Sequence, residues 1–128
     1  MRVLLDTHIL IAIARNELAT RFPSVDSLLT SAHSESFASV ASLWEIAIKS
    51  RLGKLDPGAP LDQLASIFES YGFAVLDITR HHAVAFVEPE PFTRDPFDRM
   101  LLAQCKVEGM RLVTLDRALV NHPLSSPA

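Results

Sequence analysis

Two aspartates follow short apolar segments, at positions where side chains can carry out chemistry. Asp6 comes directly after the apolar run of residues 1–5, and Asp116 comes two residues after the apolar core of residues 112–114. Because the carboxyl ends of parallel strands meet at one edge of a sheet, both carboxylates should emerge on the same rim. Carboxylates that share a rim repel one another unless a cation neutralises them. The two aspartates therefore indicate a candidate cation site.

Glu45 lies in the middle of a predicted helix whose neighbouring residues are almost all apolar. Helix capping does not explain an acid at this position. An exposed ion pair with Lys49, four residues later, is one interpretation and contributes ~0.2–0.5 kcal/mol. A helix this apolar has little exposed surface, so the carboxylate is also expected at a boundary with the core, where a metal ion would stabilise it. Both interpretations stay open at this point.

Asp95 begins the segment DPFD at residues 95–98, which is typical of a helix start: a cap, a proline at the first position and an acid at the third. Capping alone also explains Asp6 or Asp116 taken singly, since each precedes a predicted helix. Taken together, two strand-end aspartates, a mid-helix glutamate and a helix-start aspartate can converge on one rim. An all-oxygen site of this kind suits Mg²⁺ or Mn²⁺, and the chemistry it favours is phosphodiester hydrolysis.

Short apolar strands alternate with helices along the chain, and these elements must position the acids. The predicted strands are residues 1–5, 36–39, 73–76 and 111–114. The predicted helices are residues 8–15, 24–33, 40–52, 61–71, 80–86 and 95–107, with a last short helix from Asp116. Such alternation favours right-handed crossovers and an α/β fold, with a mainly parallel central sheet of four or five short strands flanked by helices.

Length and composition predict a single domain over residues 1–128, with a loose tail from about residue 122. The chain has 128 residues, of which 48% are hydrophobic and 21% are charged, so it can bury a sizeable core. Its single cysteine, Cys105, is expected in the core. A lone cysteine and the lack of a signal peptide favour a reducing cytoplasm. The apolar run at residues 9–14 is too short to cross a bilayer, so no membrane role is expected.

The charge balance limits the class of protein. The formal net charge is −3, whereas proteins that mainly bind nucleic acid non-specifically usually carry a basic excess. A nuclease is still compatible with this charge, because an acidic metal site subtracts charge locally and bound divalent ions return it.

Four segments resemble, in order and spacing, the motifs of the PIN domains of VapC-type toxins. They are LLDTH at residues 4–8, SVASLWEIAIK at 39–49, RDPFDRMLLAQ at 94–104 and LVTLD at 112–116. The resemblance covers essentially the whole chain. It implies a PIN-like fold and an endoribonuclease that uses Mg²⁺ or Mn²⁺. It also implies the toxin of a toxin–antitoxin pair, which forms a homodimer and is held inactive by a cognate antitoxin protein.

Carried over position by position, the family's acidic site matches Asp6, Glu45, Asp98 and Asp116. Asp98 is matched because it precedes the helical stretch at residues 100–103. As a hypothesis, Asp6 and Asp98 bind the metal directly, while Glu45 and Asp116 complete the coordination or orient the attacking water. Asp95 is a fifth acid with an auxiliary role: it either approaches the metal or only caps the helix.

Other side chains near these acids are assigned supporting roles. The hydroxyls of Thr7 and Thr114 lie near the rim, where they either hold carboxylates or pack as buried strand-end residues. Lys49, Arg94 and Arg99 lie near motif acids in the sequence and are candidate contacts for RNA phosphates. The alternative for each of these three cations is a solvated side chain or a partner of a carboxylate.

Other functions start from similar residues. A phosphatase with an aspartyl nucleophile also uses an aspartate after a strand, but it expects a second aspartate where His8 stands. A phosphate-receiving module expects a paired acid near the end of the first strand and a lysine after a late strand. Both leave Glu45 and Asp98 unexplained. A PIN-like module that binds RNA or a partner without cutting stays open, although no acid of the site is missing.

Overall fold

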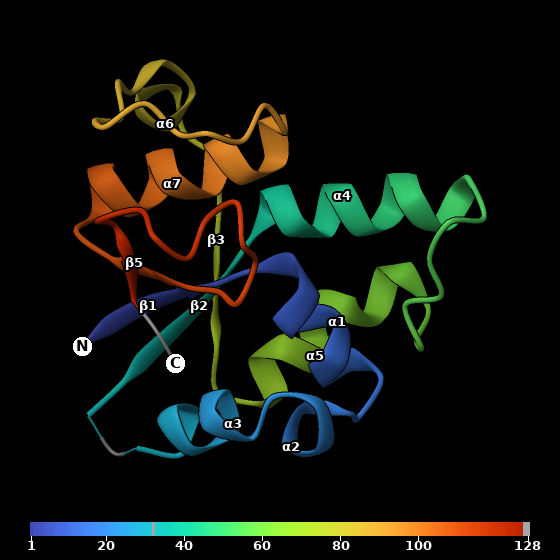
Figure 1. Cartoon of the computed structure of the whole chain (residues 1–128). Helices are drawn as coiled ribbons and strands as arrows, with labels where there is room; N and C mark the ends of the chain where they lie inside the picture. The colour runs from blue at the N-terminus through green and yellow to red at the C-terminus, as the bar shows by residue number, and fades with distance from the viewer. Residues whose placement is uncertain (32, 127–128) are drawn as a thin grey trace.

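The computed structural model describes residues 1–31 and 33–126, and at its centre is a five-stranded sheet (Figure 1). The strands are β1 (Arg2–Leu5), β2 (Glu35–Ser39), β3 (Ala74–Leu76), β4 (Arg111–Val113) and β5 (Ser125–Ser126). They lie in the order β3-β2-β1-β4-β5, and every neighbouring pair is parallel. The predicted α/β fold with a parallel sheet of short strands is therefore confirmed.

Helices cover both faces of this sheet. They are α1 (Thr7–Ala14), α2 (Leu18–Arg21), α3 (Pro23–Leu29), α4 (Val40–Arg51), α5 (Leu64–Ser70), α6 (Arg80–Val84) and α7 (Pro96–Glu108), with a 3₁₀ turn η1 (Leu61–Gln63) before α5. Figure 1 shows α6 and α7 on one side of the sheet and α1, α2, α3 and α5 on the other. Among the described residues, no helix is both long enough and apolar enough to cross a bilayer.

Side chains alternate along β1 and supply two hydrophobic cores. Val3 and Leu5 pack with the apolar sides of α1 and α5, whereas Leu4 packs with α7 on the opposite face. All three are fully buried, which explains why the strand is apolar on both faces. Helix α4 joins both cores, through Ile46 on one face and Ala41 on the other. Because both faces are covered, the rim at the carboxyl ends of the strands remains for a site.

The carboxyl ends of β1 and β4 lie side by side. Leu5 is in register with Val113, and the backbone N–H of Asp6 donates to the Val113 carbonyl at 3.0 Å. Helix α1 begins with the next residue, Thr7. The register therefore brings Asp6 to the same rim as residues 114–116, as the sequence predicts.

Local sequence sets the ends of the two helices that carry the other acids. Ser39 caps α4, its hydroxyl accepting the backbone N–H of Ala41 at 2.9 Å. Asp95 caps α7, and Pro96 occupies the first helical position, where its missing N–H costs nothing. Helix α7 ends at Gly109, whose φ of 67° is left-handed and therefore favours glycine.

The helix predicted at residues 24–33 is wrong at both ends. Helix α3 begins at Pro23, whose fixed φ suits a first helical position, and the separate helix α2 precedes it. Helix α3 ends at Leu29, because the N–H of Ser31 bonds the carbonyl three residues back rather than four. Residue 32 of the predicted helix lies outside the described residues.

The C-terminal segment also differs from its prediction. Residues 117–121 form turns rather than the predicted helix, and the backbone N–H of His122 bonds the Leu119 carbonyl, three residues back. The sequence predicts a loose tail from residue 122, whereas residues 125–126 form strand β5. The backbone N–H of Leu112 in β4 donates to the Leu124 carbonyl at 2.8 Å, and strand β5 pairs with β4 at the edge of the sheet. Residues 127–128 lie outside the described residues.

Candidate functional site

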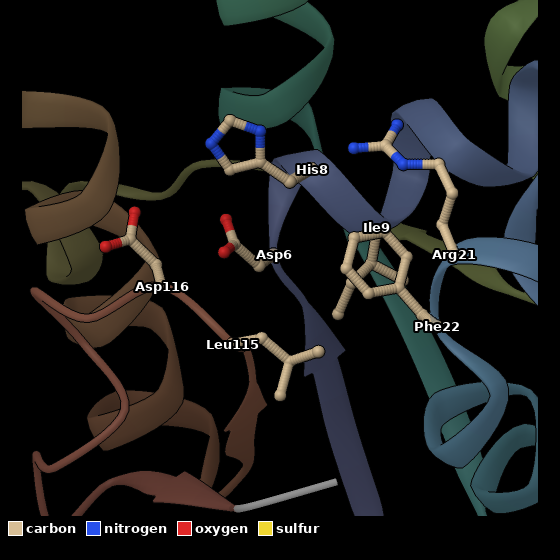
Figure 2. Close-up of a pocket in the computed structure, with 7 residues that line it drawn as sticks. All are labelled: Asp6, His8, Ile9, Arg21, Phe22, Leu115 and Asp116. Carbon is tan, nitrogen blue, oxygen red and sulfur yellow. The ribbon is translucent and has the colours of Figure 1, made fainter.

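A pocket opens at the carboxyl ends of β1 and β4, and Asp6 and Asp116 both line it (Figure 2). Its volume is about 220 Å³. The remaining walls are formed by His8, Ile9, Arg21, Phe22 and Leu115. The structure thus brings together the two aspartates that the sequence places on one rim.

Thr114 fixes both of these aspartates. Its buried hydroxyl donates a hydrogen bond to Asp6 Oδ2 at 2.7 Å and accepts one from the backbone N–H of Asp116 at 3.0 Å. Asp6 is 3% exposed, so its carboxylate has lost most of its water. The predicted contact between Thr114 and a carboxylate is therefore present. Thr7 instead shares a hydrogen bond of 2.8 Å with Ser42, which joins α1 to α4.

Asp98 lies in the first turn of α7. Thr93 donates a hydrogen bond to Asp98 Oδ2 at 3.1 Å. Asp95 Oδ1 accepts the backbone N–H of Phe97 at 2.8 Å and that of Asp98 at 3.3 Å, so the predicted cap is confirmed. Burial, followed by the nearby charge of Asp95, raises the pKa of Asp98 to about 6.

Asp6, Asp98 and Asp116 act on one another electrostatically although they belong to three separate segments. Burial raises the pKa of Asp6, and the charge of Asp116 raises it further. The hydrogen bond from Thr114 and the charge of His8 oppose this rise. The charges of Asp6 and Asp116 also contribute to the raised pKa of Asp98. A bound cation would offset the raised pKa values of Asp6 and Asp98, as expected of carboxylates in a metal site.

Glu45 lies on α4 and is only 5% exposed, as expected of a carboxylate at the boundary of the core. Its Oε2 accepts a hydrogen bond from Lys49 Nζ at 2.5 Å. This bond raises the pKa of Lys49, burial opposes it, and the charges of Glu45, Asp95 and Asp98 raise it further. The predicted pair with Lys49 is therefore present, but its carboxylate is buried. Lys49 also links Glu45 electrostatically to the acids at the start of α7.

An aromatic contact sets the spacing between α4 and α7. The rings of Trp44 and Phe97 meet edge to face, with their centroids 5.5 Å apart. Each ring belongs to the residue directly before a predicted site acid, Glu45 or Asp98. The contact therefore holds the two acid-bearing helix segments beside each other.

The donor set of this rim suits a magnesium-like ion rather than zinc. The predicted ligands Asp6, Glu45, Asp98 and Asp116 offer carboxylate oxygens only. Over residues 1–31 and 33–126, no three His, Cys, Asp or Glu side chains gather closely enough to enclose a metal. Zn²⁺ requires three or four such protein ligands. Mg²⁺ instead keeps several waters and is held by one or two carboxylates together with substrate phosphates. This open, oxygen-only rim therefore fits Mg²⁺ or Mn²⁺ with a phosphodiester.

Two of the three basic residues predicted near phosphate are engaged within the protein. Lys49 forms the ion pair described above. Arg99 donates to the Thr93 carbonyl at 2.9 Å and to Glu90 Oε1 at 2.6 Å, which fastens the loop before α7. Arg94 is exposed and stays a candidate for contact with phosphate.

Three residues of the pocket, His8, Arg21 and Phe22, have no predicted role from the sequence. His8 stands two residues after Asp6 within a motif segment, and this spacing is a signal that could have identified it. Arg21 and Phe22 lie at the junction of α2 and α3, where no local pattern marks them.

Comparison with protein families matches residues 3–123 to the PIN domain. Among solved structures, the fold is similar to VapBC2 from Rickettsia felis bound to a DNA fragment from its promoter, with a TM-score of 0.67 and 15% identity over 98% of this chain and 96% of that chain. It is also similar to a domain of a functionally unknown protein from Methanocaldococcus jannaschii, with a TM-score of 0.52 and 17% identity over 91% of this chain and 79% of that chain. No curated protein matches the chain. Identities this low establish similarity of fold alone.

Proposed function

This chain belongs to the PIN domain family, whose members are generally nucleases, and we propose that it is a metal-dependent endoribonuclease. It hydrolyses RNA phosphodiester bonds at the rim that bears Asp6, Glu45, Asp98 and Asp116. The observation that carries this proposal is that Asp6 and Asp116 line one pocket and that their charges contribute to the raised pKa of Asp98, which belongs to a third segment. Aspartates that serve only as helix caps have no reason to lie near other acids, because like charges repel.

We assign Mg²⁺ or Mn²⁺ as the cofactor, in keeping with an oxygen-only donor set. Asp6 and Asp98 would hold the ion directly, and Glu45 and Asp116 would complete its coordination through water or orient the attacking water. When bound, the ion polarises the phosphate and lowers the pKa of a coordinated water.

The surrounding residues of the chain prepare the carboxylates before RNA arrives. Thr114 fixes the orientation of Asp6 through its 2.7 Å hydrogen bond. Thr93 does the same for Asp98, while Asp95 anchors the helix turn on which Asp98 stands. Such supporting contacts reduce the reorganisation needed when charge develops on the phosphate.

We further propose that the chain is the toxin of a toxin–antitoxin pair, forms a homodimer and acts on RNA in the cytoplasm. Its similarity to VapBC2 over 98% of the chain supports a cognate antitoxin as its partner. Exposed apolar side chains also support a protein partner: Val84 is 83% exposed, Phe86 63% and Phe92 97%.

The test is cleavage of single-stranded RNA by the purified chain with Mg²⁺, with Mn²⁺ and with chelator. We expect discrete fragments only when metal is present. Asp6→Asn and Glu45→Gln should lower the cleavage rate by about 100-fold or more, because each removes a carboxylate from the site. Asp62→Asn is the matched control, since Asp62 is exposed on the 3₁₀ turn η1, and it should cleave normally.

Two results would contradict this proposal. Absence of cleavage by folded, antitoxin-free protein at every metal tested would favour a module that binds RNA or a partner without cutting it. Full activity in Asp6→Asn or Glu45→Gln would remove that residue from the site.

A further inference from the structure

The pocket wall that faces Asp6 and Asp116 carries basic and aromatic side chains. Figure 2 shows His8 beside the carboxylates of Asp6 and Asp116, with Arg21 and Phe22 across the pocket from Asp116. These three side chains come from the first turn of α1, the end of α2 and the junction of α2 with α3. The fold therefore places a guanidinium group, an imidazole and one aromatic ring beside the acidic rim.

Arg21 is exposed and only loosely engaged. Its Nη1 lies 3.5 Å from Glu17 Oε2, which is a long and solvent-exposed ion pair and therefore a weak one. Its guanidinium carbon lies 5.2 Å from the centre of the Phe22 ring. An anionic group that enters the pocket can replace Glu17 as the partner of Arg21 without breaking a buried contact.

Phe22 presents an aromatic surface at the same place. The ring is partly buried against the core, which limits its movement, and it also lines the pocket. Leu115, which is 46% exposed, adds a second apolar side chain to the lining. The pocket thus combines an apolar wall with a guanidinium group and an imidazole, in a volume of about 220 Å³.

We propose that His8, Arg21 and Phe22 form a subsite that holds one unpaired nucleotide of single-stranded RNA next to the phosphate that is cut. This inference rests on the proposed ribonuclease function. Arg21 and His8 contact the backbone phosphate of that nucleotide, and its base lies against the Phe22 ring. Binding to the ring is tolerant of sequence, because every base has an aromatic face.

The same geometry selects single strands. A base in an A-form duplex is stacked between its neighbours and cannot reach a side chain at the wall of a pocket. A base in a single strand can turn out and stack on an aromatic ring. We therefore expect cleavage in single-stranded segments and loops, with the same sequence protected when it is paired.

Nucleoside 5′-monophosphates separate binding from cleavage, because they contain a base and a phosphate but no phosphodiester bond. We would titrate adenosine and uridine 5′-monophosphate into isotope-labelled protein with Mg²⁺ and follow binding by NMR. The result expected is a set of shifts at Arg21, Phe22 and His8, with ring-current shifts of the base protons. Phe22→Leu should weaken binding by about fivefold or more, the lower end of the effect of losing one base–aromatic stack.

Arg21→Gln is the second variant, because Arg21 is exposed and its removal leaves the core intact. It should weaken nucleotide binding and raise the KM for single-stranded RNA, with a smaller change in kcat. Arg80→Gln, which removes an exposed charge from the first residue of α6, is the control and should bind nucleotides normally. Thermal unfolding of each variant verifies that it is folded.

The outcomes for the subsite and for the nuclease are distinguishable. Metal-dependent RNA cleavage together with nucleotide binding that is absent, or unaffected by Arg21→Gln and Phe22→Leu, would overturn the subsite and leave the nuclease standing. Nucleotide binding that both variants weaken, in a protein that cuts no RNA, would support the subsite and overturn the nuclease. Equal cleavage of paired and unpaired RNA would also contradict the subsite.

Discussion

Replacing Asp98 by asparagine should stabilise the metal-free protein while abolishing its activity. In the folded protein the pKa of Asp98 is raised to about 6 from its ordinary value of 3.8, by burial first and then by the charge of Asp95. Above pH 6 the folded state therefore holds a carboxylate that would be more stable in the unfolded chain. Asparagine removes that charge and keeps a side-chain oxygen to accept the hydrogen bond from Thr93.

The size of this effect follows from the pKa. A rise from 3.8 to about 6 corresponds to an upper limit of about 3 kcal/mol. Because Asp98 is only partly buried, screening by solvent reduces this to about 1 kcal/mol. In a chain of 128 residues, 1 kcal/mol shifts the Tm by about 4 °C. We therefore expect Asp98→Asn to melt about 4 °C above the wild type at pH 7.5.

Thermal unfolding in chelator, followed by circular dichroism between pH 4 and pH 8, measures this difference. The raised pKa makes the wild type lose stability as the pH rises from about 4 to about 6, so the advantage of Asp98→Asn should vanish near pH 4. Adding Mn²⁺ should raise the Tm of the wild type but not that of the variant. Asp62→Asn is the control and should be unchanged. A Tm of Asp98→Asn equal to or below that of the wild type at pH 7.5 would refute the inference that burial and the neighbouring charge of Asp95 destabilise the ionised Asp98 carboxylate.

Three further predictions follow from the same contacts. Thr114→Val removes the hydroxyl that orients Asp6, so its affinity for Mn²⁺ should fall by about 10- to 100-fold in a calorimetric titration; wild-type affinity would show that Thr114 only packs. Asp95→Ala should be about 1 kcal/mol less stable in urea than Asp95→Ser, which retains a helix cap, and equal midpoints would contradict the capping role. Cleavage of RNA at limiting Mg²⁺ should decline below about pH 6, as protonation of Asp98 competes with the metal, and a rate independent of pH from 5 to 8 would count against Asp98 as a ligand.

The parts of the fold that could be predicted are those with strong local patterns. Val3, Leu4 and Leu5 are buried on both faces of the sheet, and an uninterrupted apolar run is the local signal of such a strand. The carboxyl ends of parallel strands share a rim, so the meeting of Asp6 and Asp116 was also predictable. Cys105 is fully buried, as its apolar helix predicted.

The parts that could not be predicted depend on contacts between distant segments. Strand β5 consists of two serines, and its pairing with β4 rather than any apolar pattern makes it a strand. Helix α2 has only four residues and none of them is buried, so it leaves no periodic signal. For that reason the positions of Arg21 and Phe22 beside the acids could not be anticipated. The Thr7 hydroxyl bonds Ser42, which is 35 residues away, a contact that sequence spacing does not reveal.

Crystals soaked with Mn²⁺ would show whether the carboxylates at the rim hold the metal ion that RNA cleavage requires. Anomalous scattering locates Mn²⁺ independently of any assumption about its ligands. We expect an anomalous peak about 2.1 Å from a carboxylate oxygen of Asp6 and of Asp98, at Mn²⁺ concentrations that support cleavage. Mn²⁺ bound away from both residues, or no bound Mn²⁺ at those concentrations, would contradict this expectation.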